Sequence, residues 1–321
     1  MTRLEPAEPA VLPDDIAAAM HRIRTNVRET PVIEIRAGEL GLPTPVTLKL
    51  ELLQHAGSFK TRGAFNRVLA AEEAGEVGAA GLIAASGGNH GAAVAYVGRQ
   101  IGRPVEIFMP STSPAVKRLR IESFGANVHV IEGYFDDANR ACVQHQAETG
   151  ALFVHPFEHP HIIAGQGTMS IELDDQVGEY DTLIAAAGGG GFIAGQAAWV
   201  RDTRRVVGVE PSSSCCMHAA LANGAPVPVD VSGVAADSLG CIQLGAAAWT
   251  IVQQHVDESV LVSDEAIRAA QRSLWDELRL VVEPGGAAAL AALQTGAYVP
   301  EPGERVVVAV CGSNCDPATV Q

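Results

Sequence analysis

Residues 81–91 read Gly-Leu-Ile-Ala-Ala-Ser-Gly-Gly-Asn-His-Gly, an apolar run that passes directly into a glycine-rich turn. The run has no polar alternation, which is typical of a strand covered on both faces. After the turn, the stretch Gly91–Ile101 has the pattern of a helix. Ligands of α/β folds bind where the carboxyl ends of strands meet such turns. The stretch therefore predicts a fold class and also the place where chemistry should be sought.

The same unit of apolar strand, turn and helix recurs along nearly the whole chain. Together with Gly81–Ala85, strands are expected at Val46–Leu50, Val105–Met109, Asn127–Ile131, Leu152–His155, Thr182–Ala186, Val206–Glu210 and Val306–Val310. Further helices are expected at Pro114–Phe124, Phe135–Thr149 and Asp264–Leu278. This alternation predicts an α/β fold with mostly parallel sheets and flanking helices.

The composition excludes several classes of partner. The chain has 321 residues and a formal net charge of −15, so it repels nucleic acid phosphates and anionic membranes. No apolar run reaches the ~18 residues of a membrane span, and Met1–Pro13 lacks the features of a signal peptide. The six cysteines are sparse and have no finger-like spacing. We therefore expect reduced thiols, a cytoplasmic location and no metal.

A second glycine-flanked turn, Gly-Ser-Phe-Lys-Thr-Arg-Gly-Ala at residues 57–64, contains one of only three lysines in the chain. A solvated surface lysine is the ordinary alternative for such a residue. A lysine at the start of a helix has its pKa lowered by desolvation and by the helix dipole. A lowered pKa is what an amine needs to attack an aldehyde and form a Schiff base. Lys60 is therefore a candidate catalytic residue.

Two further turns have the chemistry of anion sites. Residues 188–191 are four consecutive glycines between a strand and a helix, and their bare amide groups are suited to a phosphate. They match neither a Walker loop nor a Gly-x-Gly-x-x-Gly turn. In the turn 86–91, small residues let backbone amides approach a substrate carboxylate, and Asn89 is suited to a ring oxygen. A tight capped turn, with His90 in a structural role, is the alternative.

The last predicted strand ends in Cys-Gly-Ser-Asn at residues 311–314, and a helix of small residues begins after Glu283. A strand end and a helix start are the plain interpretations of these two elements. All the turns nevertheless fit one ligand, which would bring an aldehyde to Lys60 and a phosphate to residues 188–191. It would also bring a ring hydroxyl to Asn89 and a ring nitrogen to Cys311. Pyridoxal phosphate has all four groups.

On these motifs the chain resembles the serine/threonine dehydratase family of fold-type II pyridoxal-phosphate enzymes, from about Ile16 to Asp316. The matching motifs are residues 58–64, 86–91, 155–157, 163–168 and 188–191. The resemblance implies a two-lobed fold like that of the tryptophan synthase β subunit. A large cofactor-binding lobe would comprise residues 1–77 and 160–321, and a small mobile lobe residues 78–159. A homodimer is also implied.

The resemblance further implies the reaction and a role for each site residue. Lys60 would hold the cofactor as a Schiff base and act as the base in β-elimination of water from L-threonine or L-serine, giving a 2-oxo acid and ammonia. Further cofactor contacts are implied for Phe59, Asn89, Gly188, Gly189, Gly190, Gly191, Glu283 and Cys311. Contacts to the substrate carboxylate are implied for Ser86, Gly88, Asn89 and His90.

Some positions depart from the pattern of the relatives. Gly87 stands where serine racemase carries a serine that protonates the opposite face, which favours elimination over racemisation. Glu210 matches one ligand of the relatives' divalent-cation site, but Cys216 stands at the second position, so no metal is expected. The turn at 311–314 differs from the usual Ser-Gly-Gly-Asn. Because the sequence ends at Gln321, no C-terminal regulatory domain is expected.

Three alternatives stay open at this point. One is a serine racemase, and another is a dehydratase of a different β-hydroxy amino acid such as 3-hydroxyaspartate. The second carboxylate of that substrate would need an extra cation, for which Arg62 and Arg140 are not excluded. The third is a non-catalytic nucleotide-binding regulator, with Glu210 on a ribose at the expected distance after the glycine run. The regulator leaves Lys60 unexplained.

Overall fold

The computed structural model describes residues 10–320, and in this part of the chain ten strands form two separate sheets. The larger sheet has the order β1-β2-β10-β7-β8-β9, and the smaller has the order β5-β4-β3-β6. The strands are β1 (Val32–Ile35), β2 (Val46–Lys49), β3 (Leu82–Ala85), β4 (Val105–Pro110), β5 (Asn127–Ile131), β6 (Leu152–Phe153), β7 (Thr182–Ala186), β8 (Arg205–Pro211), β9 (Glu258–Val262) and β10 (Val306–Ala309).

Helices connect most of the strands. They are α1 (Pro13–Ile23), α2 (Lys60–Glu73), α3 (Asn89–Ile101), α4 (Ala115–Glu122), α5 (Phe135–Thr149), α6 (Pro160–Gln176), α7 (Gly191–Val200), α8 (Cys216–Asn223), α9 (Ala236–Leu239), α10 (Ala246–His255), α11 (Asp264–Leu278) and α12 (Pro284–Thr295). Among the helices of residues 10–320, none combines the length and hydrophobicity that crossing a membrane requires.

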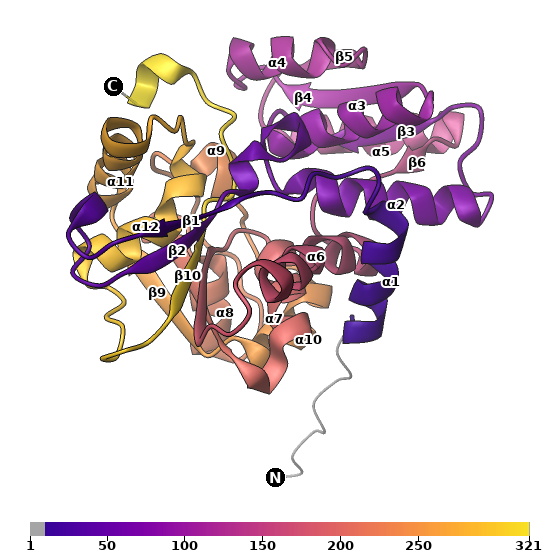
Figure 1. Cartoon of the computed structure of the whole chain (residues 1–321). Coiled ribbons are helices and arrows are strands. Elements are labelled where there is room, and N and C mark those ends of the chain that lie inside the picture. Colours follow the sequence, from indigo (N-terminus) through magenta and orange to yellow (C-terminus); the bar gives the residue numbers. More distant parts are fainter. Residues whose placement is uncertain (1–9, 321) are drawn as a thin grey trace.

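The smaller sheet shows why its strands are apolar throughout. Its strands are all parallel, and successive residues of β3 point to opposite faces. Leu82 and Ala84 pack in one core cluster with residues of α2 and α3, while Ile83 and Ala85 pack in another with Phe108 and Cys142. Helices therefore cover both faces. In Figure 1 this sheet and its helices α3, α4 and α5 lie at the upper right.

The larger sheet is parallel except at one edge, where β1 pairs with β2 in the antiparallel sense. The helices α11 and α12 lie on one side of it, and α6, α7 and α10 lie on the other (Figure 1). Its core is almost entirely aliphatic, and β10 at its centre contributes four buried residues. The turn that follows β10 contacts the smaller sheet, because Nδ2 of Asn314 donates to Oδ1 of Asn89 at the start of α3.

The predicted α/β class with mostly parallel sheets and flanking helices is confirmed. Two strands were not predicted, namely β1 and β9 at the two edges of the larger sheet. Both are half exposed and contain polar residues, so they lack the continuous apolar run that marks the central strands. The strand predicted at Leu152–His155 ends already at Phe153, because the carbonyl of Val154 bonds to the ring of His90 instead of to a neighbouring strand.

Candidate active site

Lys60 is the first residue of α2, and its side chain extends toward the segment that follows β6. Its Nζ donates to the carbonyl oxygen of Pro156 at 2.8 Å and lies 5.2 Å from the centre of the Phe59 ring. Burial lowers the pKa of Lys60 below its ordinary value, although the neighbours Cys241, Cys311 and Glu283 act in the opposite direction. The predicted change in the pKa of this amine is therefore confirmed in direction.

The turn at residues 311–314 lies directly against the lysine turn. The amide of Phe59 donates to the carbonyl of Cys311 at 3.2 Å, and Ser58 pairs with Gly312 as an isolated bridge. The ring of Phe59 in turn packs against that of Phe192 in α7, with 4.1 Å between the ring centres. Two of the four predicted turns are thus joined by direct contacts, and the lysine turn also touches α7, the helix that follows the glycine run.

Asn89 at the start of α3 connects the smaller sheet to this group. Its Nδ2 donates to the carboxylate of Glu283, and its Oδ1 accepts from Nδ2 of Asn314 at 2.7 Å. Asn314 also donates to the carbonyl of Ala56 at 2.7 Å. The position of the Asn89 amide is therefore fixed from both sides. Asn314 was not among the predicted site residues.

Burial changes the pKa of two ionisable groups in this part of the site, Glu283 and Cys311. Glu283 is buried, and burial raises the pKa of its carboxyl group, while Lys117 and the bond from Asn89 lower it. Burial also raises the pKa of the Cys311 thiol, and its Sγ donates to the carbonyl of Gly285 at 3.6 Å. The Oε2 atom of Glu283 has no hydrogen-bond partner within the described part of the chain.

The four glycines at 188–191 run from β7 into the first turn of α7, whose leading amides have no partner inside the helix. A Cβ atom at Gly189 would lie 2.5 Å from the Phe157 ring, and one at Gly190 would lie 2.5 Å from Leu244. Gly190 also has φ +90°, which disfavours any side chain. The loop is therefore a tightly packed row of backbone amides.

The turn at 86–91 is partly closed by its own side chains. The amide of Gly88 donates to Oγ of Ser86 at 3.2 Å, and Nε2 of His90 lies 2.6 Å from the carbonyl of Val154. Burial lowers the pKa of His90 to about 3, so the ring is neutral and acts as the donor. A Cβ atom at Gly87 would lie 1.9 Å from Oγ of Ser113, so this hydroxyl already fills the space of a residue-87 side chain.

The residues considered for the alternatives have other partners. Arg62 is buried between the carboxylates of Glu51 and Glu172, and the exposed Arg140 pairs with Asp137. Neither is a free cation for a second substrate carboxylate. Within residues 10–320 no three His, Cys, Asp or Glu side chains are grouped to hold a metal ion.

Glu210 is fully buried, and its carboxylate accepts from the amides of Met217 and His218 at 2.9 and 2.7 Å. It therefore caps the beginning of α8 and is not available to bind a ribose. The neighbouring Cys216 donates its thiol to the carbonyl of Gly188 at 3.3 Å, which ties the start of α8 to the glycine loop.

Some residues near the site were not singled out as site residues by the sequence. Phe157 packs against the glycine loop, and its neighbour Pro156 accepts the bond from Lys60. The buried Lys117 of α4 pairs with Asp237 of α9 at 2.6 Å, next to Gly88. The motif at 155–157 was a signal for the first two, whereas the ion pair joins residues 120 positions apart and has no local signal.

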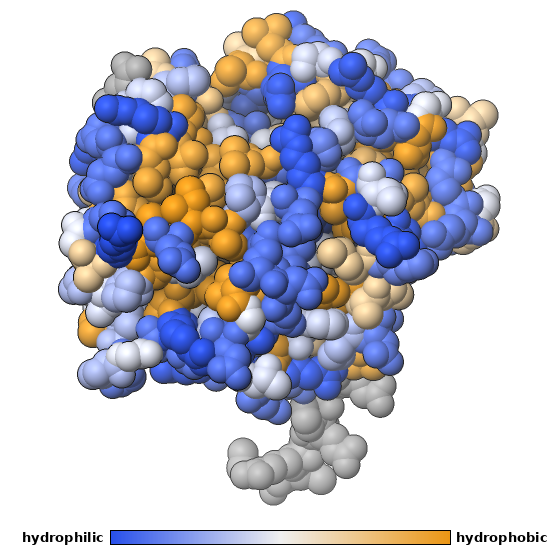
Figure 2. All heavy atoms as spheres, in the orientation of Figure 1, coloured by the Kyte–Doolittle hydropathy of each residue, from blue (hydrophilic) through white to orange (hydrophobic). Residues whose placement is uncertain are grey.

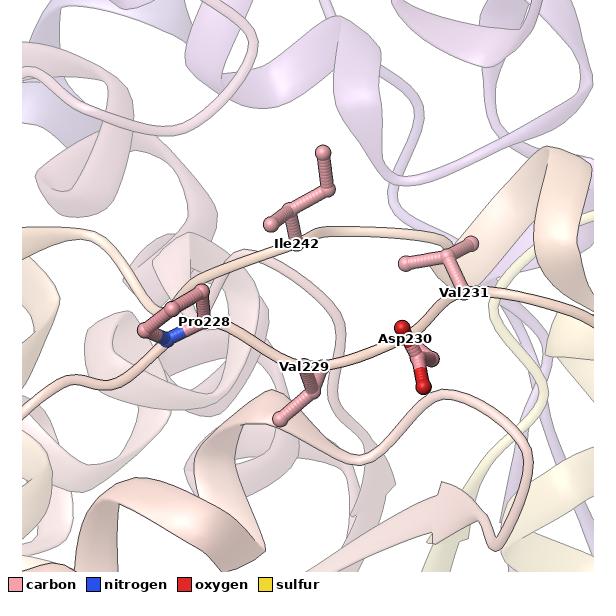
Figure 3. Close-up of a pocket in the computed structure, with 5 residues that line it drawn as sticks. All are labelled: Pro228, Val229, Asp230, Val231 and Ile242. Atoms are coloured by element: carbon pink, nitrogen blue, oxygen red, sulfur yellow. The ribbon is translucent and has the colours of Figure 1, made fainter.

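Figure 3 shows a surface depression lined by Pro228, Val229, Asp230, Val231 and Ile242. The two segments around it are linked by a hydrogen bond from the amide of Val229 to the carbonyl of Ile242. None of the candidate residues lines this depression, and Asp230 is its one ionisable side chain. The candidate site is therefore the meeting point of the turns.

Pyridoxal phosphate fits the groups that the turns bring together. The glycine loop offers backbone amides at the beginning of α7 in a row too crowded for side chains, which suits a phosphate. Lys60 offers an amine of lowered pKa, and Phe59 offers a ring face beside it. The buried Oε2 of Glu283, which has no partner in residues 10–320, and the thiol of Cys311, whose pKa is raised, are polar groups suited to a polar ring.

Comparison with known proteins agrees with this fit. Residues 23–312 match the model of the family described as "Pyridoxal-phosphate dependent enzyme". The chain is 37% identical to an L-threonine ammonia-lyase of Geobacter sulfurreducens, over 95% of this chain and 76% of the relative. It is also 37% identical to a phenylserine dehydratase of Ralstonia pickettii, over 99% and 98% of the two chains.

The fold is likewise similar to that of a solved serine racemase. The structure of maize serine racemase superimposes with a TM-score of 0.90 at 31% identity, over 97% of this chain and 96% of the maize chain. This agreement covers both sheets and includes the fold-type II architecture that the sequence predicted. The chain belongs to the family of pyridoxal-phosphate dependent enzymes.

Proposed function

We propose that this enzyme is an ammonia-lyase that removes water from L-threonine or L-serine and releases a 2-oxo acid and ammonia. The observation that carries the proposal is the place of Lys60, whose amine of lowered pKa lies where the turns of both sheets meet. The similarity to an L-threonine ammonia-lyase over most of both chains supports the same reaction. For L-threonine the overall change is the amino acid to 2-oxobutanoate plus ammonia, because the water lost in elimination returns in hydrolysis.

Each cofactor contact in the proposal has a physical reason. The amides at 188–191 would hold the phosphate, Phe59 would border the ring, and Asn89 would donate to the ring hydroxyl. Glu283 would lie on the same side of the cofactor as Asn89, whose Nδ2 donates a hydrogen bond to its carboxylate. When bound, pyridoxal phosphate supplies an electron sink that makes the α-proton of an amino acid acidic.

Lys60 would act as the general base. An amine with lowered pKa is more often unprotonated near neutral pH, which is the form that accepts a proton from the α-carbon of the substrate. The hydrogen bond to the carbonyl of Pro156 holds Nζ in a fixed direction before the reaction. A backbone carbonyl is far too weak a base to take up a proton near neutral pH. The carbonyl of Pro156 therefore positions the amine and does not compete with it for the substrate proton.

Cys311 would influence the type of reaction because its side chain is uncharged. The thiol has a raised pKa and stays protonated, so it offers no negative charge to retain a proton on a ring nitrogen. A neutral partner at this position disfavours long-lived storage of negative charge and favours prompt loss of the β-hydroxyl. This preference supports elimination over reactions that need a long-lived carbanion.

The carboxylate of the substrate would bind at residues 86–90. The beginning of the 13-residue helix α3 carries a partial positive charge, and the residues before it are small and partly exposed. Ser86, Gly88 and Asn89 would contribute backbone amides or polar groups. His90 would contribute its backbone alone, because its ring is neutral and bonded to Val154.

Racemisation is the second candidate, and one observation favours it. The chain is similar to a serine racemase structure, and the hydroxyl of Ser113 lies where a residue-87 side chain would be. Ser113 is partly exposed. Elimination is preferred because Gly87 itself has no group that can return a proton.

The lobes, the assembly and the location are also proposals. The assignment of residues 1–77 and 160–321 to a large lobe and 78–159 to a small mobile lobe is supported by the two sheets, although residues 1–9 and 321 lie outside the described part.

A homodimer is supported by a broad hydrophobic area over the region of α12, β1 and β2 (Figure 2). A cytoplasmic location is supported by six cysteines that form no disulfide.

The test is the release of 2-oxo acid by the purified holoenzyme. L-threonine, L-serine and 3-hydroxyaspartate are supplied separately, and the products are separated from D-amino acids by chiral chromatography. The proposal expects 2-oxobutanoate from L-threonine or pyruvate from L-serine as the main product. If D-serine is the main product, the enzyme is a racemase and the proposal is wrong. If neither L-threonine nor L-serine reacts, the proposal is refuted.

A further inference from the structure

Lys117 is a buried lysine with no role in the steps proposed above. Its side chain is 5% exposed, and its Nζ lies 2.6 Å from Oδ2 of Asp237. It projects from α4, which packs with α3 and β5 of the smaller sheet, whereas Asp237 belongs to α9, which packs against α12. The ion pair therefore bridges the elements of the two sheets.

The pair lies beside the loop to which the substrate carboxylate is assigned. A Cβ atom at Gly88 would lie 3.9 Å from Nζ of Lys117 and 3.4 Å from the carbonyl of Asp237. Lys117, Asp237 and Lys60 all act on the carboxyl group of Glu283, so the pair shares the electrostatic surroundings of the catalytic amine. An amino acid bound at this loop must therefore approach Lys117 closely.

Two other buried cations of the chain, Arg62 and Lys49, already have carboxylate partners. Arg62 lies between two carboxylates, and Lys49 donates to Glu172 at 2.8 Å. Lys117 is balanced by Asp237 alone among its established partners, and the carboxylate of Asp237 is 44% exposed. A pocket lined by α4 and by residues 313–315 opens beside Lys117, so small solutes have access to this region.

We propose that Asp237 masks Lys117 and that this ion pair determines substrate choice. The inference rests on the proposed function. With the pair intact, the site selects amino acids that have one carboxylate and an uncharged side chain. A second carboxylate would meet the negative charge of Asp237 at close range, where like charges repel strongly. Without Asp237, the ammonium of Lys117 is free to bind that second carboxylate.

The experiment is a double-mutant cycle on the holoenzyme with Asp237→Asn, Lys117→Gln and both changes together. We expect Asp237→Asn to raise the ratio of kcat/KM for 3-hydroxyaspartate to that for L-threonine by about tenfold or more, which corresponds to about 1.4 kcal/mol. The double variant must lose this gain, because the cation that produces it is absent. Asp230→Asn, an equal change of charge on an exposed residue, is the matched control and should leave the ratio unchanged.

A binding measurement gives a second readout that does not depend on turnover. Calorimetry compares succinate with butanoate, a monocarboxylate of equal length, on the same variants. Asp237→Asn should tighten succinate by about fivefold or more and change butanoate by less than about twofold. If Asp237→Asn does not fold, Asp237→Ser carries the same expectation.

Two results would overturn the inference. One is an unchanged preference in Asp237→Asn by both measurements, and the other is a gain that persists in the double variant. Failure of the proposed function gives a different result, because the parent enzyme would then release no 2-oxo acid from L-threonine. The succinate and butanoate affinities would still decide the role of the ion pair in that case.

Discussion

The substitution Glu172→Gln tests how the lysine helix is held in place. Arg62 lies two residues after Lys60 and is completely buried. Its guanidinium bonds to Glu51 at 2.7 and 2.8 Å and to Glu172 at 2.6 and 2.8 Å. Lys49 donates to Glu172 at 2.8 Å, so two cations balance two carboxylates in a region that excludes water.

The size of the effect follows from this balance. Glu172→Gln keeps the shape of the side chain but leaves two buried cations with one carboxylate. Breaking a buried ionic network in this way costs about 3–5 kcal/mol in the free energy of unfolding. At roughly 2 °C per kcal/mol for a chain of this size, the thermal midpoint should fall by about 6–10 °C.

The assay is thermal unfolding followed by circular dichroism, with Glu73→Gln as control. Glu73 is 60% exposed and pairs with Arg22 on the surface, so its loss should cost less than about 1 kcal/mol. If both variants shift the midpoint equally, the buried network does not stabilise α2 and the reasoning is wrong.

Three further changes give specific expectations. Gly189→Ala places a methyl group against Phe157 and should weaken cofactor binding about tenfold, as measured by fluorescence titration, whereas Gly78→Ala meets no atoms and should not. Burial raises the pKa of Glu210 to about 7, so between pH ~4.5 and 7 the native state binds more protons than the unfolded state, and stability falls as the pH rises. Glu210→Gln should remove about 3 kcal/mol of this pH dependence, measured by denaturant titration at several pH values. An unaltered dependence of stability on pH would contradict this expectation. The pKa of His90 is lowered to about 3, so below pH ~6.5 the unfolded state binds a proton that the native state does not, and stability falls as the pH falls. His90→Asn should make this loss of stability less steep. An equally steep loss in the variant would show that His90 is not its cause.

Much of the site was predictable because its chemistry is local in sequence. Each glycine-rich turn follows an apolar strand, so Lys60 and residues 86–91 and 188–191 could be assigned to turns before any contact was known. Parallel strands bring the turns of each sheet to one edge, and contacts such as that of Asn314 with Asn89 join the turns of the two sheets. The direction of the pKa change at Lys60 followed from the same reasoning.

The parts that were not predicted depend on contacts between distant segments. The pairing of Lys117 with Asp237 and the bond from Asn314 to Asn89 join residues that no periodicity relates. Glu210 had a plausible ligand role in sequence, but the start of α8 occupies its carboxylate. The edge strands β1 and β9 were missed because half-exposed strands do not need continuous apolar runs.

The most direct test of the account is to locate the lysine that carries the cofactor. The holoenzyme is reduced with borohydride, which fixes the cofactor to its lysine, then digested and mapped by mass spectrometry. The chain has three lysines, and two of them, Lys49 and Lys117, are buried in ion pairs, so the label should appear on the peptide that contains Lys60. A label on Lys49 or Lys117, or a reduced holoenzyme without a labelled lysine, would contradict the central claim.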